Sequence, residues 1–370
     1  MWLKTLRLKA LRFSSWSITN ALKGFIRGSP LSIMGRRGRR VIHNYSHNSP
    51  LPRRSVKLAR DRLKSHDHTA VTRLLPSRPI ERRMPLLHQP LPDVPAYVNA
   101  FSAAPLPVLR HTVRAMAALR ASGQSIGARH LAGIVLADPL MALRLLSHLE
   151  CHRAQSQNHD ITTIERAVMM LGVEPFFTLF DDLPTVEDAL AEHPRALVGV
   201  LKVIGRARKV ADYARDFAVL RRDLDVQEIT VAALLHETTE IVWWIHAPTL
   251  SLEIQRRQLD QPGLRSTDAQ RAVFGTTAAE LQLALIRAWR LPQLLVALLD
   301  DREQDNPRVR TIRLAADFSR HLARGWDNPA LPDDLGALEA LLHMGRDALL
   351  ARLGAPEEAR LRLQSPASAS

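Results

Sequence analysis

The chain has 370 residues, of which 51 are Lys or Arg and 37 are Asp or Glu, and its formal net charge is +14. The basic excess lies in residues 1–60, which contain 14 basic residues and no acidic one, so the remaining 37 basic residues balance all 37 acidic ones. This balance argues against nucleic-acid binding by the folded region, because a general electrostatic attraction would require a basic domain. The hydrophobic content of 46% excludes disorder of the whole chain. The single cysteine, Cys151, excludes an intramolecular disulfide and fits a reducing compartment, so we expect a cytoplasmic protein.

Residues 1–83 are a basic leader that is open to three interpretations. The favoured one is a disordered tail, or residues added by an early start assignment, since Met34 and Met84 are alternative starts. The second is weak attachment to an anionic membrane or to nucleic acid, because apolar residues between Trp2 and Phe13 are interspersed with Lys and Arg in an amphipathic pattern. The third is a targeting peptide, since the segment is rich in Arg and Ser and almost free of acidic residues.

From Pro105 onward, nearly every segment has the spacing of apolar residues that predicts a helix. The predicted helices cover residues 109–119, 130–136, 139–149, 167–171, 278–289 and 309–319, with two more between residues 332 and 353. The boundary signals are Asp138 before Pro139, capping boxes at Thr162–Glu165 and Thr277–Glu280, and Gly172 as a stop. No segment alternates apolar and polar residues between turn signals, so no sheet is expected and the fold class is all-α.

A stretch containing several acidic residues and two prolines, 181–194, divides the helical region into two lobes. We expect an N-terminal helical lobe at about residues 105–185 and a second lobe at about residues 194–325. Residues 326–355 are predicted to form C-terminal helices, and residues 364–370, rich in Ser and Ala, a disordered tail.

Several short motifs occur in a fixed order along both lobes. They are Pro105-Leu106-Pro107, Asp138-Pro139 followed by Leu145-Leu146, residues 161–172 (ITTIERAVMMLG), residues 232–237 (AALLHE), Phe274-Gly275, Ala279-Glu280-Leu281 and Trp289-x-Leu291-Pro292. In the order and spacing of these motifs, residues 101–325 resemble the HDOD domain, a divergent relative of the HD metal-dependent phosphohydrolases and of the HD-GYP cyclic-dinucleotide phosphodiesterases. The resemblance implies a two-lobed, HD-like all-α fold and a bacterial signalling or regulatory role, often as an interaction module without demonstrated catalysis.

The resemblance also allows the metal site of the HD enzymes to be traced residue by residue. Those enzymes hold one or two divalent metals with an upstream His, an adjacent His-Asp pair and a distant Asp, and the metals activate a water. In this chain the pair reads His236-Glu237, the distant Asp corresponds to Asp317, and residues 204–207 (IGRA) contain no upstream His. The additional histidines of the HD-GYP enzymes correspond to Ala278 and to Asp300-Asp301.

The resemblance therefore implies that most of the metal site is lost. We expect no catalytic residue, no bound metal and no cofactor, and we interpret His236, Glu237 and Asp317 as vestiges of the HD site. His236 is expected to form a structural hydrogen bond with the backbone or with a carboxylate. A weakly bound metal ion at these three residues is the less favoured alternative.

Two further features are candidates for binding. Arg206, Arg208 and Lys209 form a basic run on the long helix before the His-Glu pair, and such a run is typical of a solvated helix face. Trp243 and Trp244 are adjacent and point to different sides of a helix, so at least one of them should be buried in the core. The other is a candidate partner contact, since Trp is enriched at binding hot spots.

The first functional hypothesis is a non-enzymatic signalling module that binds a protein or a small signalling ligand between its lobes. The alternative is a metal-dependent phosphohydrolase of cyclic dinucleotides or nucleotides with a reduced site, which would use His236, Glu237 and Asp317 with help from Asp300 or Asp301. A third hypothesis is a protein that attaches to nucleic acid or to an anionic membrane through the basic leader.

Overall fold

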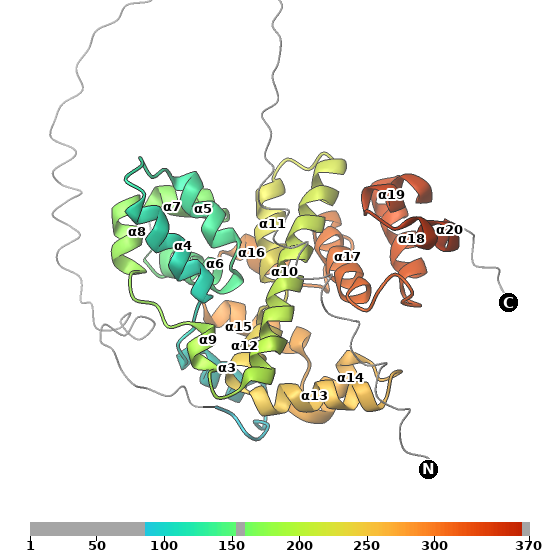
Figure 1. Cartoon of the computed structure of the whole chain (residues 1–370), viewed down its shortest axis with the longest axis horizontal. Helices are drawn as coiled ribbons and strands as arrows, with labels where there is room; N and C mark the ends of the chain where they lie inside the picture. Colours follow the sequence, from blue (N-terminus) through green and yellow to red (C-terminus); the bar gives the residue numbers. More distant parts are fainter. Residues whose placement is uncertain (1–85, 153–159, 365–370) are drawn as a thin grey trace, which may run out of the picture. The chain divides into compact units, whose positions relative to one another are not determined.

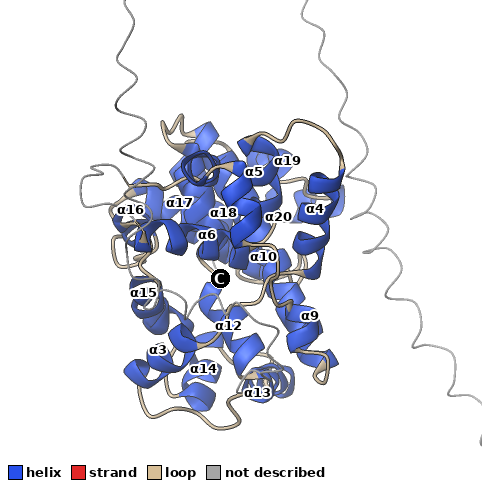
Figure 2. Ribbon diagram, turned by 90° about the vertical axis from the view of Figure 1, so that its left-hand side faces the viewer, coloured by secondary structure: helices blue, strands red, loops and turns tan. Residues whose placement is uncertain are grey.

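The computed structural model of the chain describes residues 86–152 and 160–364. The predictions for the leader, residues 1–83, and for the tail beyond Gln364 lie outside these residues and stay predictions. In the described part, the regular structure is helical, and an isolated parallel bridge between Val108 and Thr185 is the single β-type contact. The predicted all-α, two-lobed fold is confirmed (Figure 1, Figure 2).

The N-terminal lobe is a group of short helices. They are α4 (Arg110–Ala121), α5 (Ala128–Leu136), α6 (Pro139–Cys151), α7 (Ile164–Leu171), α8 (Val173–Leu179) and α9 (Val186–Ala189). The predicted N-cap Asp138 is confirmed, because its buried carboxylate accepts hydrogen bonds from the backbone N–H groups of Leu140 and Met141. The same carboxylate accepts a hydrogen bond from the Thr112 hydroxyl at 2.7 Å, so it also ties α4 to α6.

The second lobe is built around α10 (Pro194–Leu220), a helix of 27 residues. It continues with α11 (Val226–Leu235), α12 (Thr238–His246), α13 (Pro248–Asp260), α14 (Ser266–Phe274), α15 (Ala278–Ala288), α16 (Gln293–Leu298) and α17 (Pro307–Leu322). Helix α10 packs against α11, α12 and α17, and Figure 1 shows α4–α8 on one side of α10 and α11, with α17 on the other. Side chains from α10 and α17 can therefore reach the same point on α11.

Additional helices extend the fold at both ends. Helix α3 (Val94–Ala103), which the sequence analysis did not predict, packs against α15, and the Tyr97 hydroxyl donates a hydrogen bond to the Phe274 carbonyl at 2.9 Å. Helices α18 (Leu331–Leu342) and α19 (Arg346–Arg352) lie where two helices were predicted, and α18 packs against α17. Helix α20 (Glu357–Gln364) follows them, so Gln364 is helical and does not belong to the predicted tail.

The two predicted capping boxes differ in outcome. The box at Thr277 is present, and its hydroxyl accepts a hydrogen bond from the backbone N–H three residues later. The prediction of a capping box at Thr162 is wrong, because α7 has Thr163 as its N-cap. The Thr162 hydroxyl instead donates a hydrogen bond to Glu228 Oε1 of α11 at 2.6 Å. A carboxylate is a strong acceptor, and here the second lobe supplies it. Thr162 therefore links the two lobes instead of capping a helix.

The buried apolar side chains of both lobes belong to one continuous core. Phe176 of α8 and Phe217 of α10, for example, are both fully buried in it. Shared burial of this kind stabilises the lobes against separation. In the described part of the chain, no helix combines the length and the apolar character that crossing a membrane requires.

Candidate functional site

The His236-Glu237 pair lies in the joint between α11 and α12. Helices α10 and α17 both pack against α11, and each brings an arginine to this joint. These are Arg206 from α10 and Arg320 from α17. The joint therefore gathers charged side chains from segments that are far apart in the sequence.

The Glu237 carboxylate is held between the two guanidinium groups. Its Oε2 lies 2.5 Å from Arg206 Nη2, and its Oε1 lies 3.2 Å from Arg320 Nη2. The residue is only 3% exposed. Burial alone would raise the pKa of Glu237, but Arg206 and Arg320 hold it well below its usual range. Glu237 is therefore ionised, and both of its oxygens are engaged by cations of the chain.

Arg206 belongs to the stretch in which the resemblance places an upstream metal-binding His. The prediction that it lies on a solvated face is wrong, because its side chain is mostly buried and pairs with Glu237 and, also at 2.5 Å, with Glu240 Oε2. Burial raises the pKa of Glu240 in spite of the opposing charge of Arg206. A guanidinium is charged at any physiological pH, so a permanent cation of the chain lies beside these carboxylates.

His236 is flanked by two carboxylates. Its Nε2 lies 3.5 Å from Asp301 Oδ2, and its Nδ1 lies 3.8 Å from Glu237 Oε1. Burial would lower the pKa of His236, but the two carboxylates raise it to about 9. The imidazole is therefore protonated at neutral pH, and an imidazolium has no free lone pair to offer a metal ion.

Asp317 joins the same network through Arg320, whose Nη1 lies 3.1 Å from Asp317 Oδ1. Of the two aspartates considered as helpers, Asp301 contacts the imidazole, whereas Asp300 is bound by the Arg302 guanidinium at 2.6 Å. The three positions traced by the resemblance are thus brought into one network, in which His236 lies beside Glu237 and Arg320 links Glu237 to Asp317.

This network does not fit a divalent metal ion. A metal site needs carboxylates free to coordinate, neutral histidines and an open coordination position. Here guanidinium groups hold both oxygens of Glu237 and one oxygen of Asp317, and His236 lies between two carboxylates that favour its protonated form. Within residues 86–152 and 160–364, no group of three or more His, Cys, Asp or Glu side chains is arranged to hold a metal.

The contacts that Arg206, Glu240 and Arg320 make in this network were not predicted from the sequence. Arg206 had a signal, since it lies in the stretch where a metal-binding His is missing. Arg320 follows Asp317 by three residues on a helix, a spacing at which opposite charges pair. Their contacts with Glu237 depend on how α10 and α17 pack on α11, which residue spacing does not specify.

The two tryptophans considered as partner contacts lie on α12, and both are buried. Trp243 stacks on Phe274, with the ring centroids 4.1 Å apart. Trp244 lies against α10, where a Cβ added at Gly199 would be 2.5 Å from the indole ring. A partner contact through either indole stays a prediction, and it would require α12 to move.

An all-α, two-lobed fold with a residual His-carboxylate pair after α11 defines an HD-like protein. The sequence model of the HDOD domain matches residues 106–304, more than half of the chain. The chain therefore belongs to the HDOD family, as the resemblance predicted. The wider domain boundaries, residues 101–325, and the boundaries of the lobes stay predictions.

Several solved structures match the chain at low sequence identity. A virulence factor from Campylobacter jejuni subsp. jejuni is 17% identical with a TM-score of 0.51, and the match covers 75% of this chain and 98% of that one. The MmoQ response regulator from Methylococcus capsulatus is 19% identical with a TM-score of 0.48, covering 70% and 98%. An HDOD domain protein with unknown function from Geobacter sulfurreducens is 18% identical with a TM-score of 0.37, covering 74% and 99%. No protein of curated function matches the sequence.

Proposed function

We propose that the chain is a non-enzymatic signalling or regulatory module that acts by binding a protein or a small ligand. The observation that carries this proposal is the position of Arg206 and Arg320 on the Glu237 carboxylate. The chain's own cations hold the group that would have to bind a metal in an HD phosphohydrolase.

The chemistry of phosphate ester hydrolysis supports the same conclusion. HD phosphohydrolases need a metal that lowers the pKa of a bound water and steadies the charge that develops on phosphate. A guanidinium can steady an anion, but it cannot coordinate and activate a water as a metal does. Glu237 is also a poor general base, because the two arginines lower its pKa well below the usual range.

The experiment that tests the proposal combines metal analysis with a hydrolysis assay. Purified full-length protein is incubated with Mn²⁺ or Zn²⁺, desalted, analysed for metal content and assayed with a cyclic dinucleotide. We expect no stoichiometric metal and no turnover. Stoichiometric metal together with turnover that is lost in His236→Ala would overturn the proposal in favour of a reduced phosphohydrolase.

A matched control identifies the source of any turnover. His321 is a second partly buried histidine of the same lobe that also contacts a carboxylate, Asp334 Oδ2 at 2.6 Å. It belongs to α17 but makes no contact with Glu237 among the described ion pairs. If the network around His236 catalyses the turnover, His321→Ala should retain the activity that His236→Ala loses. Equal activity in the wild type and both variants would indicate a contaminating enzyme and leave the proposal standing.

A further inference from the structure

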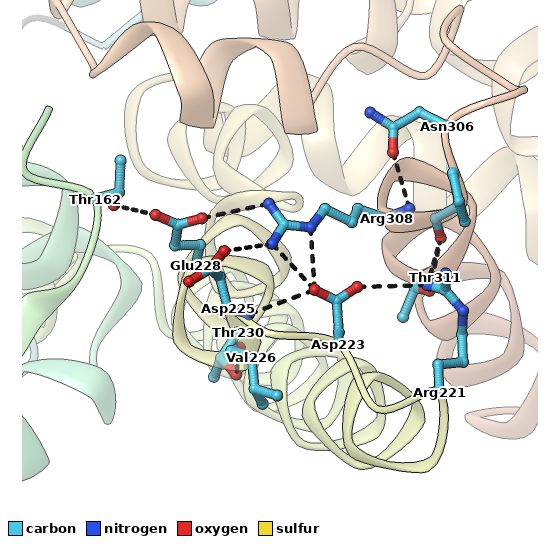
Figure 3. A network of polar contacts seen from close by, with 11 residues as sticks. Thr162, Arg221, Asp223, Asp225, Val226, Glu228, Thr230, Asn306, Arg308 and Thr311 are labelled. Carbon is cyan, nitrogen blue, oxygen red and sulfur yellow. Dashed lines mark hydrogen bonds and ion pairs between the residues drawn. The ribbon is translucent and has the colours of Figure 1, made fainter.

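A cleft opens between the two lobes at the N-terminal end of α11. Its volume is about 410 Å³, and it is lined by Thr162, Thr163, Glu165, Arg166 and Met169 from the first lobe and by residues 224–228 from the second. Figure 3 shows Thr162 on one side of this region facing Glu228 on the other. The His-Glu pair follows the opposite end of α11, ten residues or about 15 Å away, so the cleft is a separate site.

Two large apolar side chains of the cleft lie in solvent. Leu224 is 95% exposed and Met169 is 61% exposed. Single exposed apolar residues are common on protein surfaces, but these two line the same concave feature from opposite lobes. Methionine also adapts its shape to different apolar partners. The cleft therefore offers an apolar contact that a bound chain could cover.

The charged side chains that line the cleft are three acidic ones, Glu165, Asp225 and Glu228, and one basic one, Arg166. Arg308 Nη2 lies 2.8 Å from Asp225 Oδ2 and 3.0 Å from Asp223 Oδ1, and its Nη1 lies 3.4 Å from Glu228 Oε2. Figure 3 shows this one guanidinium shared among the three carboxylates. Asp225 is the most accessible of the three, since its side chain is 56% exposed. Arg221 adds a second guanidinium, whose Nη1 lies 3.7 Å from Asp223 Oδ2, so two positive charges face these three carboxylates. The exposed Asp225 carboxylate is the group of the network that can exchange its partner for another cation.

We propose that this cleft binds a peptide segment of a partner protein that carries an apolar side chain next to a Lys or Arg. The apolar side chain would contact Leu224 and Met169, and the basic group would pair with Asp225. Leu224 lines the rim of the cleft and is largely in solvent, so an extended peptide that runs out of the cleft can cover it, whereas a compact ligand inside the cleft would leave it in water. This inference rests on the proposed binding function and assigns it a surface and a partner chemistry.

Selection from random peptides tests the proposal. Phage displaying random peptides of about twelve residues are selected on immobilised full-length protein, and the affinities of enriched peptides are measured by fluorescence anisotropy. We expect enriched peptides with an apolar residue next to Lys or Arg. Leu224→Ser and Asp225→Asn should each weaken their binding about tenfold or more.

Matched variants elsewhere on the surface serve as controls. Leu259→Ser removes another exposed leucine, and Asp260→Asn neutralises another exposed aspartate in an ion pair with arginine. Both controls should bind the selected peptides like the wild type. Absence of enrichment, enrichment of acidic peptides, or equal binding by Leu224→Ser and the wild type would overturn the proposal.

The two proposals fail in distinguishable ways. A cyclic dinucleotide that binds without hydrolysis and loses affinity in Asp225→Asn, with no peptide enriched, would replace the peptide by a small ligand and leave the non-enzymatic function in place. Metal-dependent turnover that requires His236 would overturn the proposed function whether or not peptides bind at the other end of α11.

Discussion

Helix α11 has a network of arginines and carboxylates at each end, and the two networks differ in composition and in exposure. After its C-terminal end, two guanidinium groups hold the buried carboxylate of Glu237. At its N-terminal end, the guanidinium groups of Arg308 and Arg221 contact three carboxylates, of which Asp225 is more than half exposed. The first network is closed, because its central carboxylate is buried, whereas the second is open, because the carboxylate of Asp225 is in contact with solvent.

The difference in exposure between the two networks predicts a structural role for the first and a binding role for the second. A buried charge is stabilised only as long as its partners stay in place, since removing a partner leaves an unpaired charge in a poor solvent. An exposed charge is solvated with or without its partner, so it can exchange one cation for another at little cost. The same chemical groups therefore fix the fold at one end of α11 and remain available to a partner at the other.

The largest loss of stability is expected when the charge at the centre of the closed network is removed. Glu237→Gln removes the charge that both Arg206 and Arg320 contact, and we expect the free energy of unfolding to fall by ~3–5 kcal/mol in urea titrations. Asp181→Asn is the control, because its ion pair with Arg120 is exposed and should matter little. A loss below ~1 kcal/mol in Glu237→Gln would contradict the comparison, since it would show that the buried network is as tolerant as an exposed one.

The centre of this network shows what the sequence could and could not provide. The positions of His236, Glu237 and Asp317 were predicted from the resemblance to the HD enzymes, which rests on the order and spacing of short motifs. The guanidinium of Arg320 could not be placed in the same way, because its contact with Glu237 joins residues 83 positions apart. Such a contact depends on how α17 packs on α11, which is decided by the whole core.

The next largest effect is a dependence of the free energy of unfolding on pH, which we expect from His236 in the closed network. The carboxylates raise the pKa of His236 from 6.5 to about 9, so its contribution to stability is complete below pH 6.5 and is lost as the pH rises toward 9. We expect the wild type to lose up to ~3 kcal/mol over this range, and His236→Gln to lose much less. Urea titrations at several pH values measure both slopes.

His246 serves as a control, because its pKa is shifted in the opposite direction from that of His236. Burial lowers its pKa from 6.5 to about 4, so the stability that its neutral form provides is present above pH 6.5 and is lost as the pH falls toward 4. The variant His246→Gln should therefore keep the alkaline slope of the wild type. An alkaline slope that persists in His236→Gln would assign the titrating proton to another group.

The fold itself was easier to predict than its long-range contacts. Apolar spacing and the boundary signals identified a part of the helices, because these signals act over a few residues. The helices identified in this way are α4 to α7, α15, α17, α18 and α19. Helix α3 was missed, since it lies before the first motif, and it is held in place by a hydrogen bond from Tyr97 to a carbonyl 177 residues away. Thr162 was misread for a related reason, because its acceptor Glu228 belongs to the other lobe and competes with the local cap.

A substitution at the contact between α10 and α12 should disturb the closed network through the helices that support it. Gly199 of α10 lies against Trp244 of α12, and an added Cβ would be 2.5 Å from the indole, so Gly199→Ala should force the two helices apart. Since α10 carries Arg206 and α12 carries Glu240, the ion pair between them should stretch, and we expect a loss of ~1–3 kcal/mol in thermal or urea unfolding. Peptide binding at the far end of α11 should not change.

Gly205→Ala on the same helix is the matched control for this packing effect. Apart from its chain neighbours and the backbone of its own helix, no atom lies within 4 Å of the Cβ that it would add. Alanine is favoured over glycine within a helix, so this variant should be neutral or more stable by ~0.5–1 kcal/mol. Equal destabilisation by Gly199→Ala and Gly205→Ala would show that contact with the indole does not set the spacing of the helices.

The smallest effect on stability is expected at the open network. A substitution there should weaken peptide binding while the free energy of unfolding changes little. Asp225→Asn loses one exposed ion pair with Arg308, and we expect the free energy of unfolding to change by less than ~1 kcal/mol. Arg308 keeps Asp223 and Glu228 as partners, so no charge is left unpaired. Binding of selected peptides should nevertheless fall about tenfold, while Asp260→Asn changes neither quantity. If Asp225→Asn instead unfolds the protein as readily as Glu237→Gln does, the charges at the two ends of α11 have the same structural role, and exposure does not distinguish them.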